Sequence, residues 1–412
     1  MTDLHNFFEK FLSKQSLFKN KRILQSAYMP DEVLHRDEQI KQIANILAPC
    51  LRNEKPSNFF IYGKTGNGKT ITIKHVYNQL IKIAREKKVA VKIIYVNCKL
   101  KKIADTEYRL VAELARYFGK NIPATGLPTD EVYKAFFSAI DEEKQIIVLA
   151  LDEMDQLVKK VGDGVLYNIT RINSELENAQ LALIGISNDM FFANNLDPRV
   201  KSSLSEEEIL FPPYNAVQIQ SILNDRAEKA FKDEAIADGV IAKCAAYAAR
   251  EHGDARRALD LLRVAAELAE RDGSEKISIE HIDFAEEKIE KDRVFYLVEN
   301  QPKQFQATLY SVILIKTDSP NKKIFTGDIY DIYKGISQHI GLRPLTQRRI
   351  SDVIAELDMM GLINARVISK GRFGRTREID LALPASIIKK VRGILESALD
   401  LSQPPVFAEQ SD

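Results

Sequence analysis

The chain has 412 residues and a formal net charge of +1, with 45% hydrophobic and 28% charged residues. This length suggests two or three domains, and the composition excludes a disordered or fibrous protein. No run approaches the roughly 18 apolar residues of a membrane span, and three cysteines without paired spacing exclude a disulfide scaffold or a clustered zinc site. These features predict a cytoplasmic protein without a membrane partner.

The N-terminal half has the pattern of an α/β domain. Residues 1–27 are polar and mildly basic and are expected to form an arm. From Tyr28 onward, short apolar runs alternate with helical stretches. The runs occupy residues 58–62, 92–96, 145–151 and 182–187. Near-continuous apolar strands between helices predict a parallel sheet covered on both faces. We place this domain at residues 1–213.

A glycine-rich turn follows the first apolar run. Residues 63–70, GKTGNGKT, fit the phosphate-binding pattern G-x-x-x-x-G-K-[ST] at every fixed position and lie between a strand and a helix. Glycines let backbone N–H groups surround phosphates, and the helix adds the positive end of its dipole. The pattern predicts ATP or ADP with Mg²⁺, with Lys69 on the β- and γ-phosphates and Thr70 on the metal. The nucleotide-binding residues of this loop are Gly63, Thr65, Gly66, Asn67, Gly68, Lys69 and Thr70.

Polar side chains follow the next two buried runs. Asp152 and Glu153 end the third run, and Asn188 follows the fourth. An open α/β sheet binds its ligands at the carboxyl ends of its strands, so these side chains are expected beside the nucleotide. Asp152 is expected to hold Mg²⁺ through water, while Glu153 orients and deprotonates the attacking water. Asn188 is expected to hold that water near the γ-phosphate.

The pattern changes after residue 211, where Phe-Pro-Pro ends the α/β alternation. Asn215 is suited to cap a helix, and residues 214–298 are helical throughout, which predicts a small α domain. Residues 299–400 contain three helical patterns and then two β-type runs around a turn rich in Gly and Arg. This order predicts a winged-helix domain, and residues 401–412 are expected to be a tail.

The C-terminal third is basic. Residues 301–393 contain 16 Lys+Arg and 8 Asp+Glu, which predicts a polyanion-binding module. A recognition helix is expected to present its first residues to the base edges of duplex DNA, with arginine suited to guanine and glutamine to adenine. Cations in the turn between the β-type runs suit the DNA backbone or a minor groove. The predicted contacts are Thr346, Gln347, Arg348 and Arg349 on the helix, and Lys370, Arg372, Arg375 and Arg377 in the turn.

Six stretches of the chain carry a resemblance to a known family: residues 62–70, 151–158, 185–190, 196–215, 250–263 and 346–361. Their order resembles that of the AAA+ ATPases. Within these, the chain is similar to the archaeal replication-initiator family, relatives of the origin recognition complex large subunit and its cell-division-control partner. The resemblance spans most of the chain, and the last three stretches are specific to this family.

The resemblance implies further nucleotide-binding residues. Arg256 matches the sensor-2 arginine, which reaches the γ-phosphate from a helical lid, here residues 214–298. Tyr214 and Arg226 match lid positions that flank the nucleotide. The segment from Val33 to Arg36 matches the one that lines the adenine, so both of these residues are expected in the site.

Two other sites follow from the resemblance alone. Arg199 is a possible arginine finger acting on a neighbouring subunit, with a structural salt bridge as the alternative, because Ser202-Ser203 replaces the Ser-Arg of many AAA+ proteins. The loop near residues 120–127 matches an initiator-specific insertion that touches DNA in relatives. The contacts expected there are Lys120, Thr125 and Gly126.

The implied function is an ATP-binding initiator that binds duplex DNA at replication origins and helps recruit or load the replicative helicase. Other initiator subunits on the DNA, a nucleoid-associated location and slow ATP hydrolysis acting as a switch belong to the same expectation. Two alternatives stay open: a winged-helix transcription regulator with ATP-controlled oligomerisation, and a DNA-independent remodelling or clamp-loading ATPase whose basic domain docks a protein.

Overall fold

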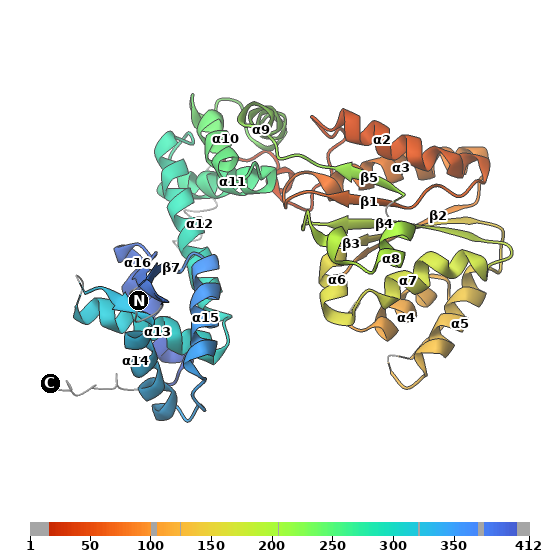
Figure 1. Ribbon diagram of the computed structural model, residues 1–412. Helices are drawn as coiled ribbons and strands as arrows, with labels where there is room; N and C mark the ends of the chain where they lie inside the picture. The colour runs from red at the N-terminus through yellow and green to blue at the C-terminus, as the bar shows by residue number, and fades with distance from the viewer. Residues whose placement is uncertain are drawn as a thin grey trace, which may run out of the picture. The chain divides into compact units, whose positions relative to one another are not determined.

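A computed structural model describes residues 16–99, 105–123, 125–204, 206–319, 322–369 and 375–401. The chain forms two compact units, Met1–Ala285 and Glu286–Asp412 (Figure 1). The division falls within one continuous helix, α12 (Ile279–Glu299). The domain boundaries at 213 and 298 stay predictions. Within the described ranges, every helix is too short or too polar to cross a membrane.

The first unit contains the predicted parallel sheet. Its five strands lie in the order β2-β3-β4-β1-β5, and every neighbouring pair is parallel. Four strands match the apolar runs of the sequence. The fifth, β5, was not predicted, because only one of its four side chains is buried and it therefore forms no apolar run. The strands are β1 (Phe59–Tyr62), β2 (Val91–Asn97), β3 (Ile146–Asp152), β4 (Gln180–Ser187) and β5 (Glu207–Leu210).

Helices cover both faces of this sheet, as expected for the α/β class (Figure 1). One face packs on α2 (Asp37–Leu47) and α3 (Lys69–Lys87). The other face carries the larger apolar core, built with the remaining helices of this layer. These are α4 (Glu107–Tyr117), α5 (Thr129–Ile140), α6 (Met154–Val161), α7 (Gly164–Arg171) and α8 (Pro198–Leu204). The carboxyl ends of the strands thus stay free to form a site.

The helical part of the first unit follows β5. It consists of α9 (Ala216–Ala230), α10 (Val240–Arg250), α11 (Ala255–Asp272) and the start of α12. Asn215 caps α9 as predicted: its Oδ1 accepts from the Gln218 N–H at 2.9 Å, and Gln218 Oε1 accepts from the Asn215 N–H at 3.1 Å. This capping box fixes where the chain leaves the sheet and turns into the helical layer.

The described end of the expected N-terminal arm is not free. Its backbone pairs with the end of α9, and the Phe18 ring stacks on Phe231 at 5.0 Å. Leu24 of the short helix η1 (Lys21–Leu24) is fully buried. Lys21 pairs with Glu267 at 2.9 Å. Composition could not reveal this packing, because the acidic partner lies far away in the sequence.

The second unit has the predicted winged-helix order, three helices followed by a hairpin. The structure adds a two-residue strand and a last helix, and the antiparallel sheet has the order β6-β8-β7. The buried side chains of α15 are those at the expected 3–4 spacing. Its elements are α13 (Lys303–Asp318), β6 (Ile324–Phe325), α14 (Thr326–His339), α15 (Gln347–Met359), β7 (Ile363–Ser369), β8 (Arg375–Leu381) and α16 (Ala385–Ala398).

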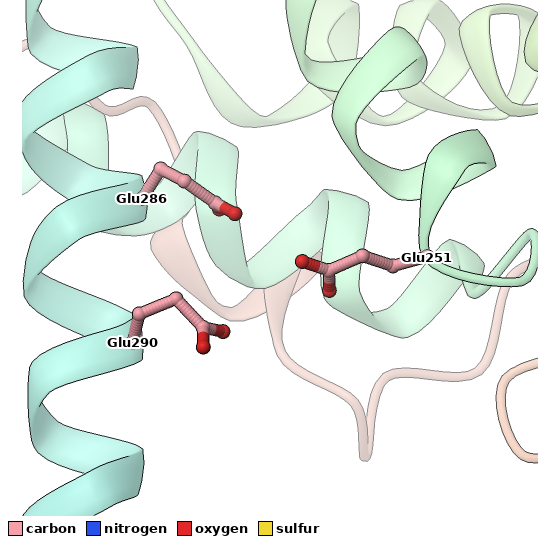
Figure 2. A group of neighbouring side chains, drawn as sticks. All are labelled: Glu251, Glu286 and Glu290. Atoms are coloured by element: carbon pink, nitrogen blue, oxygen red, sulfur yellow. The ribbon is translucent and has the colours of Figure 1, made fainter. Parts of the chain in front are cut away.

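Acidic side chains mark the start of the second unit. Glu286 and Glu290 lie four residues apart on α12 and project from the same side of that helix (Figure 2). Glu251, drawn in the same figure, belongs to the first unit and pairs there with Arg257 at 3.1 Å. The acidic side chains of α12 contrast with the basic first turn of α15.

Candidate nucleotide site and DNA-reading surface

The phosphate loop lies between β1 and α3, in the predicted context. Gly66 and Gly68 adopt positive φ of 77° and 85°. A Cβ on Gly66 would lie 1.8 Å from Asp254 Oδ1, and one on Gly68 would lie 2.5 Å from the Tyr214 hydroxyl. Both the backbone and the close approach of the helical layer therefore require glycine here.

A cavity of about 490 Å³ opens beside this loop in the first unit. The loop, the carboxyl ends of β3 and β4, and helices α9 and α11 contribute to its lining. The cavity brings together Val33, Thr65, Gly66, Asn67, Gly68, Lys69, Thr70, Asp152, Glu153, Asn188, Tyr214, Arg226 and Arg256. Two predicted residues, Gly63 and Arg36, do not line it.

Lys69 is a buried cation of the cavity, with only 6% of its surface exposed. Its ammonium donates to the carbonyls of Gly63 at 2.6 Å and Lys64 at 2.8 Å, and to Asn188 Oδ1 at 2.9 Å. These three bonds use all of its donors. The pKa of Lys69 is lowered to about 8, chiefly by burial and also by the nearby Arg256, while the Asp152 carboxylate opposes the shift. An anion in the loop would stabilise the protonated form.

Asp152 ends β3 as a buried carboxylate, 5% exposed. Its Oδ2 accepts from the Thr70 hydroxyl at 2.8 Å and from the Tyr95 hydroxyl. Its Oδ1 accepts from the Glu153 N–H at 2.8 Å. Burial and the neighbouring Asp152 raise the pKa of Tyr95, so the Tyr95 phenol keeps its proton and donates. Glu153 has a φ of 55°, and its carboxylate pairs with Lys99 at 3.7 Å.

Arg36 contacts the backbone of the phosphate loop but does not line the cavity. Its guanidinium is 2% exposed and donates to the carbonyls of Asn67 at 2.9 Å and Pro212 at 2.7 Å. It also lies 3.8 Å from the centroid of the Tyr214 ring. Burial lowers the pKa of Arg36. The two residues predicted in the segment 33–36 therefore have different positions. Val33 lines the cavity, whereas Arg36 links the phosphate loop to the segment that precedes the helical layer.

Two further arginines line the cavity from the helical layer. Arg226 is buried, lies 4.6 Å from the centroid of the Tyr28 ring, and has an Nη1 without a hydrogen-bond partner among the described residues. Burial lowers the pKa of Arg226. Arg256 lies in the first turn of α11, where the Asp254 side chain caps the helix by accepting from the Arg256 N–H at 2.8 Å. With Lys69, these residues place three cations around the cavity, which is also lined by the acidic Asp152 and Glu153.

The donor set suits a nucleotide and a hard metal ion. Mg²⁺ prefers oxygen ligands, and the Thr70 hydroxyl and Asp152 carboxylate supply them at one edge of the loop. Backbone N–H groups at a helix start, with a buried lysine, suit a polyphosphate. These are the residues that fit ATP or ADP.

Arg199 lies outside this cavity. It forms an ion pair with Asp197 at 3.0 Å, and its side chain is 70% exposed. Its guanidinium also lies 5.2 Å from the centroid of the Tyr167 ring. The structural salt bridge that was the alternative for Arg199 is therefore present. An action of Arg199 on a neighbouring subunit stays a prediction.

The predicted recognition helix, α15, presents its first turn to solvent. Thr346 caps it by accepting from the Arg349 N–H at 3.4 Å, and Thr346, Gln347, Arg348 and Arg349 are all exposed. Arg349 makes one long ion pair with Asp352, at 3.5 Å. These four polar side chains project from a helix whose opposite face is core.

The predicted turn contacts are described only in part. Lys370 and Arg372 lie outside the described residues, as does the side chain of Arg375. Arg377 lies on β8, and its Nη1 donates to the Ser351 carbonyl of α15. This bond links the hairpin to the recognition helix.

The loop matched to the initiator insertion lies in the first unit, after α4. Lys120 is half-buried and pairs with Glu142 at 2.7 Å. Thr125 and Gly126 are exposed, and Gly126 has a φ of 112°. The three predicted contacts thus share a surface loop, and their role in DNA binding stays a prediction.

Tyr28, Tyr95 and Asp254 are among the residues of the cavity region that were not predicted from the sequence. Tyr28 and Tyr95 line the cavity, yet a tyrosine in an arm or a strand carries no signal that separates it from packing. Asp254 caps α11 and lies against Gly66. An aspartate directly before a helical run is a readable cap, so that residue could have been identified.

Three family models match the chain. They are an AAA domain over residues 52–189, a Cdc6 AAA+ ATPase-type lid domain over residues 220–287, and a CDC6 C-terminal winged helix domain over residues 297–391. Together they follow the order of parts described above.

Similar proteins cover nearly the whole chain. An ORC1-type DNA replication protein of Thermococcus onnurineus is 50% identical over 392 residues, 94% of each chain. ORC1-type DNA replication protein 1 of Methanosarcina mazei is 49% identical over 389 residues, 94% of this chain and 93% of that one. A solved structure of the Aeropyrum pernix ORC1 protein in complex with DNA has a TM-score of 0.82 and 42% identity, covering 94% and 98% of the two chains.

Proposed function

The chain belongs to the family of ORC1-type DNA replication proteins, and on this premise we propose that it binds duplex DNA at replication origins under the control of ATP. One observation carries the proposal. The same chain contains a cavity lined by the phosphate loop and by Lys69 and Arg256 in its first unit, and an exposed basic helix start on a winged helix in its second unit.

The nucleotide roles follow from the contacts in the cavity. Lys69 binds the β- and γ-phosphates in exchange for its present acceptors, and Arg256 adds a cation from α11. Thr70 and Asp152 hold Mg²⁺, which neutralises phosphate charge when bound. Glu153 orients and deprotonates the attacking water, and Asn188 stabilises it while contacting Lys69.

Hydrolysis is slow in a single chain and serves as a switch. An arginine finger contributes about 10³- to 10⁵-fold to phosphoryl transfer in related reactions. Arg199 does not line the cavity of its own chain and is bound to Asp197. A lone chain therefore holds ATP for long periods, and a neighbouring subunit on DNA supplies Arg199 to complete the site.

DNA binding uses both units. Arg348 and Arg349 read base edges from α15, with Thr346 and Gln347 beside them. Lys120, Thr125 and Gly126 contact the DNA backbone from the first unit. A similar protein, the Aeropyrum pernix ORC1, was solved in complex with DNA. Other initiator subunits and the replicative helicase are the proposed partners, at the nucleoid.

A genome-wide footprint tests this function. The protein is mapped on its own chromosomal DNA with ATP, with ADP and as Lys69→Ala. An initiator is expected to concentrate at one or a few origins and to change its occupancy with the nucleotide. Occupancy at many promoters would instead favour the transcription regulator, and no occupancy would favour the protein-docking ATPase.

A further inference from the structure

Tyr95 lies on the strand next to the one that carries Asp152. Asn97 and Asp152 are register partners across β2 and β3, and Tyr95 lies two residues before Asn97. Side chains alternate along a strand, and register partners share a face. Tyr95, Asn97 and Asp152 therefore leave the same face of the sheet, the one that packs on α3.

The hydrogen bonds of Asp152 define how its carboxylate is held. Oδ2 accepts from two hydroxyls, those of Thr70 at 2.8 Å and Tyr95. Oδ1 accepts from the Glu153 N–H at 2.8 Å. A carboxylate has about four lone-pair positions, so these bonds leave about one for a further ligand. Without the Tyr95 hydroxyl, Oδ2 would keep one protein donor and the carboxylate could rotate.

We propose that Tyr95 is a positioning residue of the magnesium site, whose hydroxyl fixes the Asp152 carboxylate in the orientation in which it would hold Mg²⁺ through water. The inference rests on the proposed Mg²⁺-nucleotide function and extends it to a residue outside the phosphate loop. Partners of this kind orient a metal ligand without touching the metal.

A second tyrosine shows that packing alone does not explain this contact. Tyr77 of α3 belongs to the same core, is 5% exposed, and has a hydroxyl without a hydrogen-bond partner in the described part of the chain. Tyr95 is only half-buried, lines the cavity, and lies beneath the Lys74 ammonium, 4.7 Å from its ring centroid. Of the two hydroxyls, the one at the cavity is bonded to Asp152.

The test separates metal binding from nucleotide binding. Full-length Tyr95→Phe, Tyr77→Phe and unmodified protein are first titrated with a fluorescent ADP analogue in EDTA. The ADP-bound proteins are then titrated with Mg²⁺ without chelator, and the midpoint of the fluorescence change gives the metal affinity. Tyr77→Phe is the matched control because it removes a hydroxyl from the same core.

Tyr95→Phe is expected to weaken Mg²⁺ binding about tenfold, within the range found for second-layer partners of metal ligands. Metal-free ADP affinity is expected to match that of Tyr77→Phe. Equal Mg²⁺ affinities in both variants would overturn the inference. The inference would also be overturned if Tyr95→Phe lost as much affinity for ADP without metal as it loses for Mg²⁺. The Tyr95 side chain would then contribute to nucleotide binding itself and not to the metal site. If the unmodified protein binds ADP without any Mg²⁺ effect, the proposed metal role itself fails.

Discussion

The nucleotide cavity and the first turn of α15 use cations in opposite ways. Lys69 in the cavity and Arg36 next to its phosphate loop are almost fully buried and make three or more close polar or aromatic contacts each. Arg348 and Arg349 are exposed, and the pair from Arg349 to Asp352 is long at 3.5 Å. The first region is organised before its ligand arrives, whereas the second stays adaptable.

This difference fits the chemistry of the two ligands. A triphosphate always presents the same charges, so donors fixed in advance lose little entropy when it binds. Duplex DNA varies in base sequence and shape, and flexible exposed arginines can adjust to its base edges and phosphates. Substitutions in the cavity should therefore have large and specific effects, and those on α15 should be graded.

Lys69→Ala should cause the largest effect. Loss of charged hydrogen bonds to two phosphates is expected to weaken ATP binding about 100-fold, or about 3 kcal/mol. Lys64→Ala removes an exposed lysine from the same loop and is the matched control. Isothermal titration with ATP measures both. Similar affinities in the two variants would mean that burial does not make Lys69 the principal phosphate ligand.

Arg348→Ala should weaken binding to origin duplex about 30-fold, from the loss of about 2 kcal/mol of base contact. ATP affinity should not change. Arg293→Ala, an exposed arginine of α12, controls for the loss of one positive charge in the same unit. Fluorescence anisotropy at fixed salt compares them. An equal loss in both variants would assign Arg348 to nonspecific charge rather than to recognition.

The burial of Lys69 predicts a pH effect. Its pKa of about 8 in the free protein lies below the ordinary value for lysine, and bound phosphates would raise it again. Between these values, ATP binding should take up a proton, and at pH 9 affinity should be about tenfold weaker than at pH 7. Calorimetry at pH 8.5 in buffers of different ionisation enthalpy measures the uptake. Lys69→Arg should bind ATP without this proton uptake. If the uptake persists in Lys69→Arg, a group other than Lys69 takes up the proton.

Arg377→Ala should have the smallest effect. Its guanidinium donates to the Ser351 carbonyl, so the loss should be about fivefold in DNA affinity, from a hydrogen bond of about 1 kcal/mol. The salt dependence of binding should not change, because a positioning contact releases no counterion. A slope reduced by about one would instead show that Arg377 binds a phosphate.

The chemistry of the phosphate loop was predictable because it is local. Gly66, Gly68, Lys69 and Thr70 lie within five residues, and the required strand and helix flank them. The buried face of α15 was equally clear from its spacing. The last helix, α16, was not predicted, although Ile387, Val391 and Leu395 recur every four residues.

Contacts between distant segments could not be predicted. Nothing in the sequence shows that Tyr95 reaches Asp152, because that contact depends on the pairing of β2 with β3. Arg36 was assigned to the cavity lining, but its side chain turns behind the loop to the Pro212 carbonyl. Residue type and spacing identify candidates, and the direction of each side chain is decided by tertiary packing.

The affinity for origin duplex with saturating ATP and with saturating ADP is the most direct test of the account. Coupling between two ligand sites is expected to change an affinity at least about fivefold, and DNA must then change nucleotide affinity by the same factor. We predict such a difference in the unmodified protein and its loss in Lys69→Ala. Equal affinities for DNA with both nucleotides bound would contradict the claim that the cavity controls the DNA-reading surface.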